Sequence, residues 1–132
     1  MVIDSSALIA ILRKEPEADA FLQAIERDAV RLVSAMTKLE TSMVAIGMRD
    51  RAGGDEVGRL LTKIGATIVP FDEHHADIAR EAFARYGKGR HPAGLNFGDC
   101  AAYALAMAEA EPLLCKGADF GATDVEVVGQ GR

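Results

Sequence analysis

The segment from Leu95 to Ala110 most constrains how this chain can fold. Residues 100–108 carry no charged side chain, and their alanine-rich composition favours a helix. A helix that is apolar on every side is normally buried. Asp99 stands in its first turn, where a buried carboxylate is costly unless a cation meets it. The sequence therefore predicts a buried helix that begins with a carboxylate in need of a counter-charge.

Short apolar segments alternate with helical patterns along the rest of the chain. The predicted strands are residues 1–4, 31–33, 67–70, 113–115 and 125–128, and the predicted helices are 5–12, 16–28, 37–51, 55–64, 72–86 and 95–110. This alternation predicts one α/β domain over residues 1–132, with a mainly parallel five-stranded sheet covered on both faces.

Four local signals set expected helix ends. Thr37–Glu40 fits a capping box (T-x-x-E) near the start of the long helix, Gly53–Gly54 is expected to end it, and Asp72 is expected to cap the helix of residues 72–86. Ser5–Ser6 is a candidate cap for the first helix.

Composition limits the classes of function. With 15 basic and 20 acidic side chains, the net charge of −5 argues against non-specific coating of DNA but leaves a nucleic-acid substrate open. Two cysteines are too few for a disulfide framework, so we expect a reduced, cytoplasmic protein. No secretory signal is visible and no apolar run is long enough to span a bilayer, so we expect no membrane association.

Four acids are expected at the carboxyl edge of the sheet, where ligands of open α/β folds gather. Asp4 closes the first strand, Glu40 opens the long helix, Asp99 opens the buried helix, and Asp119 follows the fourth strand. Two carboxylates about 4 Å apart repel by roughly 4 kcal/mol at an effective dielectric near 20. A cation among them would relieve this repulsion, and oxygen-only ligands favour Mg²⁺ or Mn²⁺. Such a metal can activate a water for hydrolysis of a phosphodiester.

Each acid also has an ordinary structural explanation. Asp99 follows a possible N-cap, Asn96, by three residues, Glu40 completes a capping box, and Asp119 and Asp124 suit turns. Two patterns weigh against these explanations. Glu40 lies on an inward-facing helical stripe, and Asp4 ends a central strand without a basic residue nearby in the sequence.

Two other classes fit the sequence less well. An aspartate-nucleophile phosphatase would need an acid at the position of Ser6. A phospho-acceptor receiver domain would need an acid pair after the first strand, and Asp72 is a poor acceptor after the third.

The motifs together resemble the PIN-domain ribonucleases of the VapC toxin family. The resemblance rests on Val2–Leu12, Leu39–Glu40, Tyr86–Ala93, Leu95–Cys100, Tyr103–Ala106 and the segment from Leu113 to Asp124. It implies a three-layer α/β/α sandwich and a Mg²⁺-dependent endoribonuclease, the toxin of a type II toxin–antitoxin system. Its partners would be RNA, a VapB-like antitoxin and a second copy of the chain, in a homodimer or a toxin–antitoxin hetero-oligomer. A non-toxin housekeeping nuclease and a catalytically silent PIN binding module are the alternatives.

The resemblance also assigns residues. Asp4, Glu40, Asp99 and Asp119 match the acidic quartet of the family, as catalytic residues and metal ligands. Ala118 replaces the polar or acidic residue that usually precedes the last aspartate, which leaves Asp124 as a possible substitute for Asp119.

The remaining charged positions have open interpretations. Lys88, Arg90 and His91 would contact RNA phosphates or the antitoxin, or form a solvated loop, and Lys116 would bind phosphate or balance charge. His74–His75 are poor joint metal ligands because adjacent side chains of a helix diverge, so a solvated first turn is expected. Cys100 is expected to pack in the core.

Overall fold

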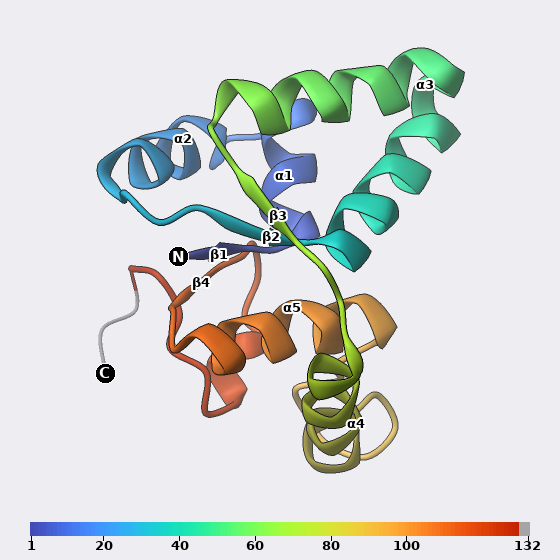
Figure 1. Cartoon of the computed structure of the whole chain (residues 1–132), viewed down its shortest axis with the longest axis vertical. Helices are drawn as coiled ribbons and strands as arrows, with labels where there is room; N and C mark the ends of the chain where they lie inside the picture. Colours follow the sequence, from blue (N-terminus) through green and yellow to red (C-terminus); the bar gives the residue numbers. More distant parts are fainter. Residues whose placement is uncertain (130–132) are drawn as a thin grey trace.

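A small, fully parallel sheet lies at the centre of the computed structural model, which describes residues 1–129 (Figure 1). Its strands are β1 (Val2–Ile3), β2 (Leu32–Ser34), β3 (Thr67–Val69) and β4 (Leu113–Leu114), in the order β3-β2-β1-β4. The chain moves outward from β1 to β3 and then returns to the other side of β1. The carboxyl ends of β1 and β4 therefore border a switch point, the usual place for a ligand site in this architecture.

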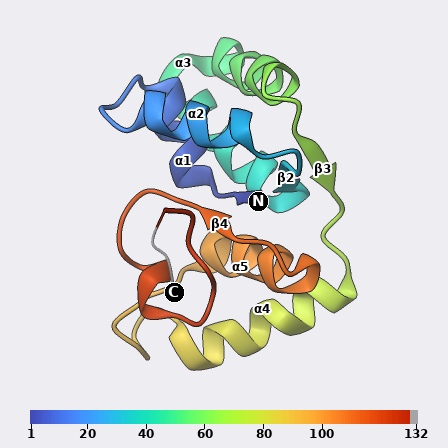
Figure 2. The ribbon, with the colours of Figure 1, turned by 90° about the vertical axis from the view of Figure 1, so that its left-hand side faces the viewer.

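Helices cover both faces of the sheet. The helices α1 (Ser5–Leu12), α2 (Ala18–Arg27) and α3 (Ala35–Lys63) lie on one face. Helix α5 (Phe97–Glu109) covers the other face, and α4 (Glu73–Tyr86) packs outside it (Figure 2). The expected three-layer α/β architecture is confirmed. No helix within residues 1–129 combines the length and apolarity needed to cross a membrane.

The short strands divide their side chains between two apolar cores. Val2 and Leu113 belong to the core beneath α5, whereas Ile3 and Leu114 belong to the core beneath α1 and α3. All four side chains are almost fully buried. This follows from the period of two in a strand, and it explains why the central segments read as continuous apolar runs.

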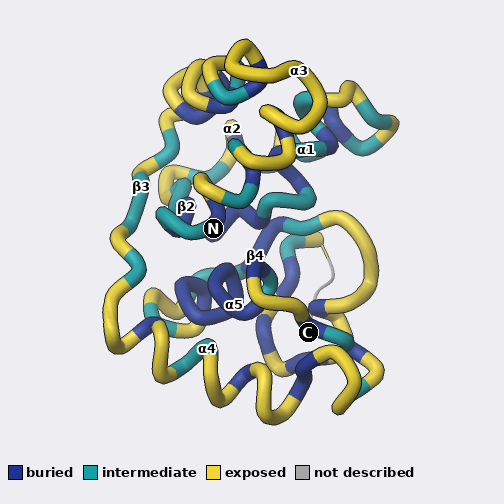
Figure 3. Tube along the Cα trace, turned by 90° about the vertical axis from the view of Figure 1, so that its right-hand side faces the viewer, coloured by how far each residue is buried: buried dark blue, intermediate teal, exposed yellow. Residues whose placement is uncertain are grey.

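Helix α5 is buried along most of its length (Figure 3). Every residue from Cys100 to Ala106 is buried, and the helix ends at Ala110, which adopts the left-handed conformation with φ of 53°. The predicted buried helix is therefore confirmed. It also makes Cys100 a core residue, as expected.

The predicted fifth strand, residues 125–128, is wrong. The segment contributes one isolated parallel bridge, between Val127 and Leu113, and the sheet has four strands. Val125 and Val127 are buried in the core beneath α5, and this burial accounts for the apolar pattern that suggested a strand.

Helix α3 differs from its prediction at both proposed signals. It begins at Ala35, capped by Ser34, whose hydroxyl accepts a hydrogen bond from Met36 N at 3.2 Å, so Thr37–Glu40 is not its capping box. Its break lies at Arg49–Asp50, where Asp50 has φ of 54°. Gly53 lies in the helical part of α3 that follows this break. A Cβ at Gly53 would overlap the carbonyl of Ala45, which lies in the part before the break. This glycine permits close helix approach rather than ending a helix.

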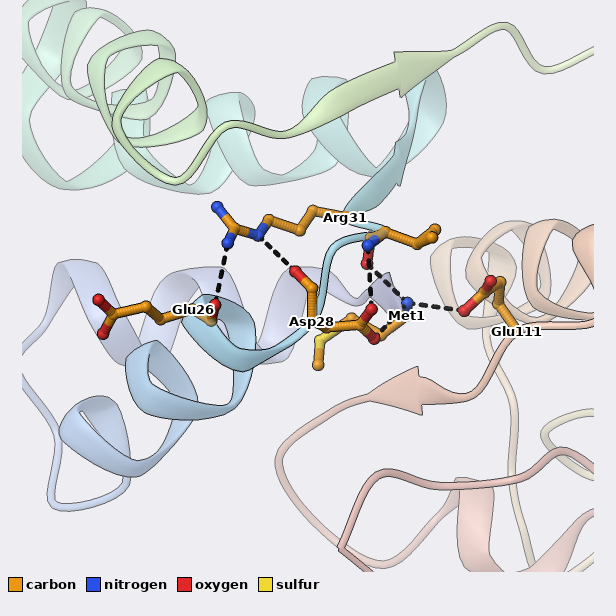
Figure 4. Close-up of polar contacts among 6 residues, drawn as sticks. Met1, Glu26, Asp28, Arg31 and Glu111 are labelled. Carbon is orange, nitrogen blue, oxygen red and sulfur yellow. Dashed lines mark hydrogen bonds and ion pairs between the residues drawn. The ribbon is translucent and has the colours of Figure 1, made fainter.

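The α-amino group of Met1 fixes the start of β1 (Figure 4). It donates to Asp28 Oδ2 at 2.8 Å, to the Val30 carbonyl at 2.7 Å and to Glu111 Oε2 at 2.7 Å. These acceptors come from the connections before β2 and before β4, the two neighbours of β1. The network therefore holds the central strand in place just before Asp4.

Candidate active site

Asp4 is the most buried acid at the carboxyl edge of the sheet. It directly follows β1 and caps α1, so the expected Ser5–Ser6 cap is wrong by one residue. Its Oδ2 accepts hydrogen bonds from Ser6 N at 3.1 Å and Ser6 Oγ at 2.6 Å. Its Oδ1 is buried and has no hydrogen-bond partner among the described residues. An unpaired buried carboxylate oxygen is costly, so this atom is available for a ligand.

Ser6 joins the loops that follow β1 and β4. While its hydroxyl donates to Asp4, it accepts a hydrogen bond from Lys116 N at 2.9 Å. The Lys116 side chain forms ion pairs with Glu15 and Glu17, at 3.0 Å for Glu17. Lys116 therefore balances local charge, which was one of its two interpretations.

Asp99 and Asn96 form a reciprocal cap at the start of α5. Asp99 N donates to Asn96 Oδ1 at 2.9 Å, and Asn96 N donates to Asp99 Oδ2 at 3.0 Å. The expected N-cap at Asn96 is thus confirmed, and Asp99 takes part in it. Only one carboxylate oxygen is used, and the cap orients the side chain at the mouth of the buried helix.

Glu40 reaches the same helix end from α3. Its carboxylate lies against Gly98, where a Cβ would overlap the Glu40 oxygens. Glu40 Oε1 is buried and lacks a hydrogen-bond partner among the described residues. The glycine next to Asp99 therefore creates the space that the second acid occupies.

Asp119 and Asp124, the two candidates of the late loop, are separated by the fold. Asp119 is exposed at the start of the short 3₁₀ turn η1 (Phe120–Ala122), and its side chain makes no capping hydrogen bond. Asp124 instead accepts a 2.5 Å hydrogen bond from Tyr103 Oη and lies 3.7 Å from an Arg85 nitrogen. Asp124 is therefore held by side chains of α4 and α5.

The charges of the four acids act on one another at this edge of the sheet. Burial, followed by the charges of Asp99 and Glu40, raises the Asp4 pKa from 3.8 to about 6. The Asp99 pKa is raised by burial and then by the charges of Glu40 and Asp119. Cys115 lies among the same charges. Burial, and then Asp4, Asp99 and Asp119, raise its pKa to about 12, so its thiol stays protonated.

The side chains of the rim do not form a closed cage. Within residues 1–129, no three acids, histidines or cysteines stand in an arrangement that would hold a metal ion as they are. The donor set nevertheless fits a hard cation, because Asp4 and Glu40 each present a buried oxygen without a partner.

Two side chains of the loop of residues 87–94 are fixed by contacts with the protein. Arg90 Nε donates to the Ala84 carbonyl at 3.2 Å, and His91 Nδ1 accepts from Ala93 N at 3.0 Å while its ring packs edge-on against Tyr86. Lys88 is exposed. Among the described residues, no hydrogen bond or ion pair joins these three side chains to the four acids.

The first turn of α4 is not fully solvated, contrary to expectation. His75 is 5% exposed and packs edge-on against Phe71, whereas Asp72 caps the helix as predicted, accepting from His75 N at 2.9 Å.

The roles of two residues beside the site, Ser6 and Gly98, were missed, and they act as described above. A glycine inside the first turn of a helix was a usable signal for Gly98. Ser6 offered none, because its second partner, Lys116, is distant in the sequence.

The raised Asp4 pKa predicts that the free energy of unfolding depends on pH. Because the folded-state pKa of about 6 exceeds the ordinary 3.8, Asp4 favours folding at low pH, and this contribution is lost as pH rises through the folded pKa. In EDTA, we expect wild-type protein to lose up to about 3 kcal/mol more unfolding free energy than Asp4→Asn between about pH 4 and 7. Urea denaturation measures this. Asp77→Asn, at an exposed position of α4, should follow wild type, and parallel curves for wild type and Asp4→Asn would contradict the prediction.

Comparisons with known proteins agree with this geometry. The model of the PIN domain family matches residues 1–126. Ribonuclease VapC of Mycolicibacterium smegmatis is 48% identical over 128 residues, covering 97% of this chain and 99% of that protein. Ribonuclease VapC30 of Mycobacterium tuberculosis is 46% identical over 128 residues, covering 97% of this chain and 98% of that protein.

Solved structures share the fold at lower identity. Mycobacterium tuberculosis VapC20, described as a sarcin-ricin loop cleaving toxin, superposes with a TM-score of 0.76 at 14% identity over 96% of this chain and 97% of that one. A toxin–antitoxin complex from Klebsiella pneumoniae gives a TM-score of 0.74 at 18% identity over 99% of this chain and 98% of that one. The parallel sheet, the acidic rim and the full-length relatives lead to one conclusion: this chain belongs to the PIN-domain family, among the VapC ribonucleases.

Proposed function

We propose that this protein, acting as a single domain, is a metal-dependent endoribonuclease toxin whose site is the rim of Asp4, Glu40, Asp99 and Asp119. The observation that carries the proposal is the convergence of carboxylates, two of which have a buried oxygen without a partner among the described residues. These two are Asp4 and Glu40, and burial, followed by the charges of Asp99 and Glu40, raises the Asp4 pKa. Such a cluster is more favourable with a cation than without one.

Mg²⁺ suits this donor set, with Mn²⁺ as a functional substitute. The available atoms are carboxylate oxygens, which are the ligands that hard cations prefer. Asp4 and Asp99 would be the principal ligands, with Glu40 and Asp119 completing the charge. When bound, the ion supplies Lewis acidity that activates water and stabilises charge on phosphodiester oxygens.

The protein's own residues orient this site. The Ser6 hydroxyl holds one Asp4 oxygen, so the other stays directed to the rim. The reciprocal cap with Asn96 fixes Asp99 at the end of a rigid buried helix, and the dipole of that helix favours negative charge there. Gly98 leaves room for Glu40. Placement of this kind is what a metal-dependent hydrolase requires of its scaffold.

The surface next to Glu40 suits an antitoxin. Exposed apolar side chains gather around a pocket there, with Phe97 75% and Met43 63% exposed, and Met36, Leu39 and Val44 beside them. Apolar surface of this kind marks a protein-binding site. A similar fold in a toxin–antitoxin complex supports the same proposal. We propose that a small VapB-like antitoxin covers this pocket and thereby the acidic rim, and that the toxin also forms a homodimer.

Cleavage of RNA tests the metal site. We expect hydrolysis with Mg²⁺ or Mn²⁺ and none in EDTA. Asp99→Asn should lower the rate by at least about 100-fold, since one preorganised charge is lost, while its amide oxygen still caps α5. Asp124→Asn is the matched control, because Asp124 lies with Tyr103, and it should retain most activity. Full activity in EDTA, or equal loss in both variants, would refute the proposed site.

Expression in a bacterial host tests the toxin role. Induction of the wild-type protein should arrest growth, and Asp99→Asn should not, since toxicity would require cleavage. Co-expression of a cognate VapB-like antitoxin should restore growth. If the wild-type protein does not arrest growth, the chain is not a toxin in that host, and if wild type and Asp99→Asn arrest growth equally, cleavage at this site is not the cause of the toxicity.

A further inference from the structure

A groove lies between the two arms of α3, on a different side of the first arm from Glu40. In Figure 1 the arms form a V, with residues 35–48 in one and residues 51–63 in the other. The groove has a volume of about 820 Å³. Its lining comes from both arms: Lys38, Ser42, Gly54, Asp55, Gly58, Arg59, Thr62 and Lys63.

The groove is basic in a protein that is acidic overall. Lys38, Arg59 and Lys63 face it together with one acid, Asp55, whereas the whole chain carries a net charge of −5. None of the three basic side chains forms an ion pair within residues 1–129, and all three are exposed. Three unpaired cations around one groove create a local positive potential that attracts an anion.

The shape and chemistry of the lining favour a phosphate backbone over a protein. No large apolar side chain lines the groove, although the core of a protein interface is normally apolar. Gly54 and Gly58 form part of the surface, and a Cβ at Gly58 would contact nothing, so the floor is open. Lysine, arginine and hydroxyl groups are typical contacts of nucleic-acid phosphates. The apolar pockets that suit a protein partner lie elsewhere, beside Phe97.

We propose that this groove binds phosphates of the RNA substrate on one side of the scissile bond, as a second subsite apart from the acidic rim. The proposal rests on the proposed ribonuclease function and deepens it. Lys38, Arg59 and Lys63 contact backbone phosphates and carry no sequence information, so they add affinity and register rather than base specificity.

The spacing along α3 allows one RNA strand to reach both the acidic rim and the basic groove. Glu40 borders the pocket on one side of the first arm, Lys38 and Ser42 border the groove, and the exposed ridge of Leu39 and Met43 lies between. A helix with its side chains is about 10 Å across. A stacked strand carries one phosphate per roughly 3.4 Å, so roughly three nucleotides would span the ridge.

The test measures RNA binding with Mg²⁺ in the Asp99→Asn background, which prevents cleavage. The probe is a single-stranded RNA of roughly 12 nucleotides, long enough to pass the ridge. Arg59→Gln/Lys63→Gln is compared with Lys14→Gln/Arg27→Gln, which removes two positive charges elsewhere on the surface, from exposed side chains that form no ion pair within residues 1–129. The slope of log Kd against log salt concentration counts phosphate contacts. We expect the groove pair to lower this slope by about 1.4, at about 0.7 per contact for single strands, and the control pair to leave it unchanged.

The outcomes separate this inference from the proposed function. In the enzyme that retains Asp99, the double substitution Arg59→Gln/Lys63→Gln should raise KM for the same single-stranded RNA and leave kcat unchanged. An unchanged slope with normal cleavage overturns the groove and leaves the nuclease proposal standing. Loss of antitoxin binding with an unchanged RNA slope also overturns it, and assigns the groove to a protein. If neither the wild-type chain nor Asp99→Asn binds or cleaves RNA, the proposed function itself fails.

Discussion

Burial of carboxylates at the carboxyl edge of the sheet is the constraint on which the rest of this structure depends. Asp4 is 2% exposed, and the charges of Asp99 and Glu40 add to burial in raising its pKa. Left alone, such a cluster opposes folding, so the surrounding elements must hold it rigidly. The Met1 network fixes β1, the Ser6 hydroxyl bridges the loops after β1 and β4, and the buried α5 anchors Asp99. Stability spent here is consistent with a functional rather than a structural role.

Helix α3 links the site to its surroundings through its different sides. One side brings Glu40 to the rim, a second exposes the apolar ridge of Leu39 and Met43, and a third turns Lys38 toward the second arm. The break at Asp50 folds the helix back, and Gly53 lets the arms meet closely. A single kinked helix thus places a carboxylate, an apolar surface and a basic groove within one turn of each other.

The sequence was most informative where one pattern had one physical cause. The uncharged run of residues 100–108 predicted the buried α5, and the spacing of Asn96 and Asp99 indicated the cap that forms. Predictions from the sequence were wrong where one sequence pattern can have several physical causes. Val125 and Val127 read as a strand because they are buried in a core, and Gly53–Gly54 read as a helix end because glycine also serves close packing. The choice between Asp119 and Asp124 depended on Tyr103, a contact that only the fold creates.

The proposed function requires that the acidic rim binds a divalent cation, and electron paramagnetic resonance of Mn²⁺ at neutral pH measures this binding. Wild-type protein and Asp124→Asn should bind Mn²⁺ with the same affinity, because Asp124 is held by Tyr103. Asp4→Asn removes a principal ligand and should weaken binding by at least about 10-fold, since even the loss of an outer partner of a metal ligand costs that much. Equal Mn²⁺ affinity in wild type, Asp4→Asn and Asp124→Asn would contradict the claim.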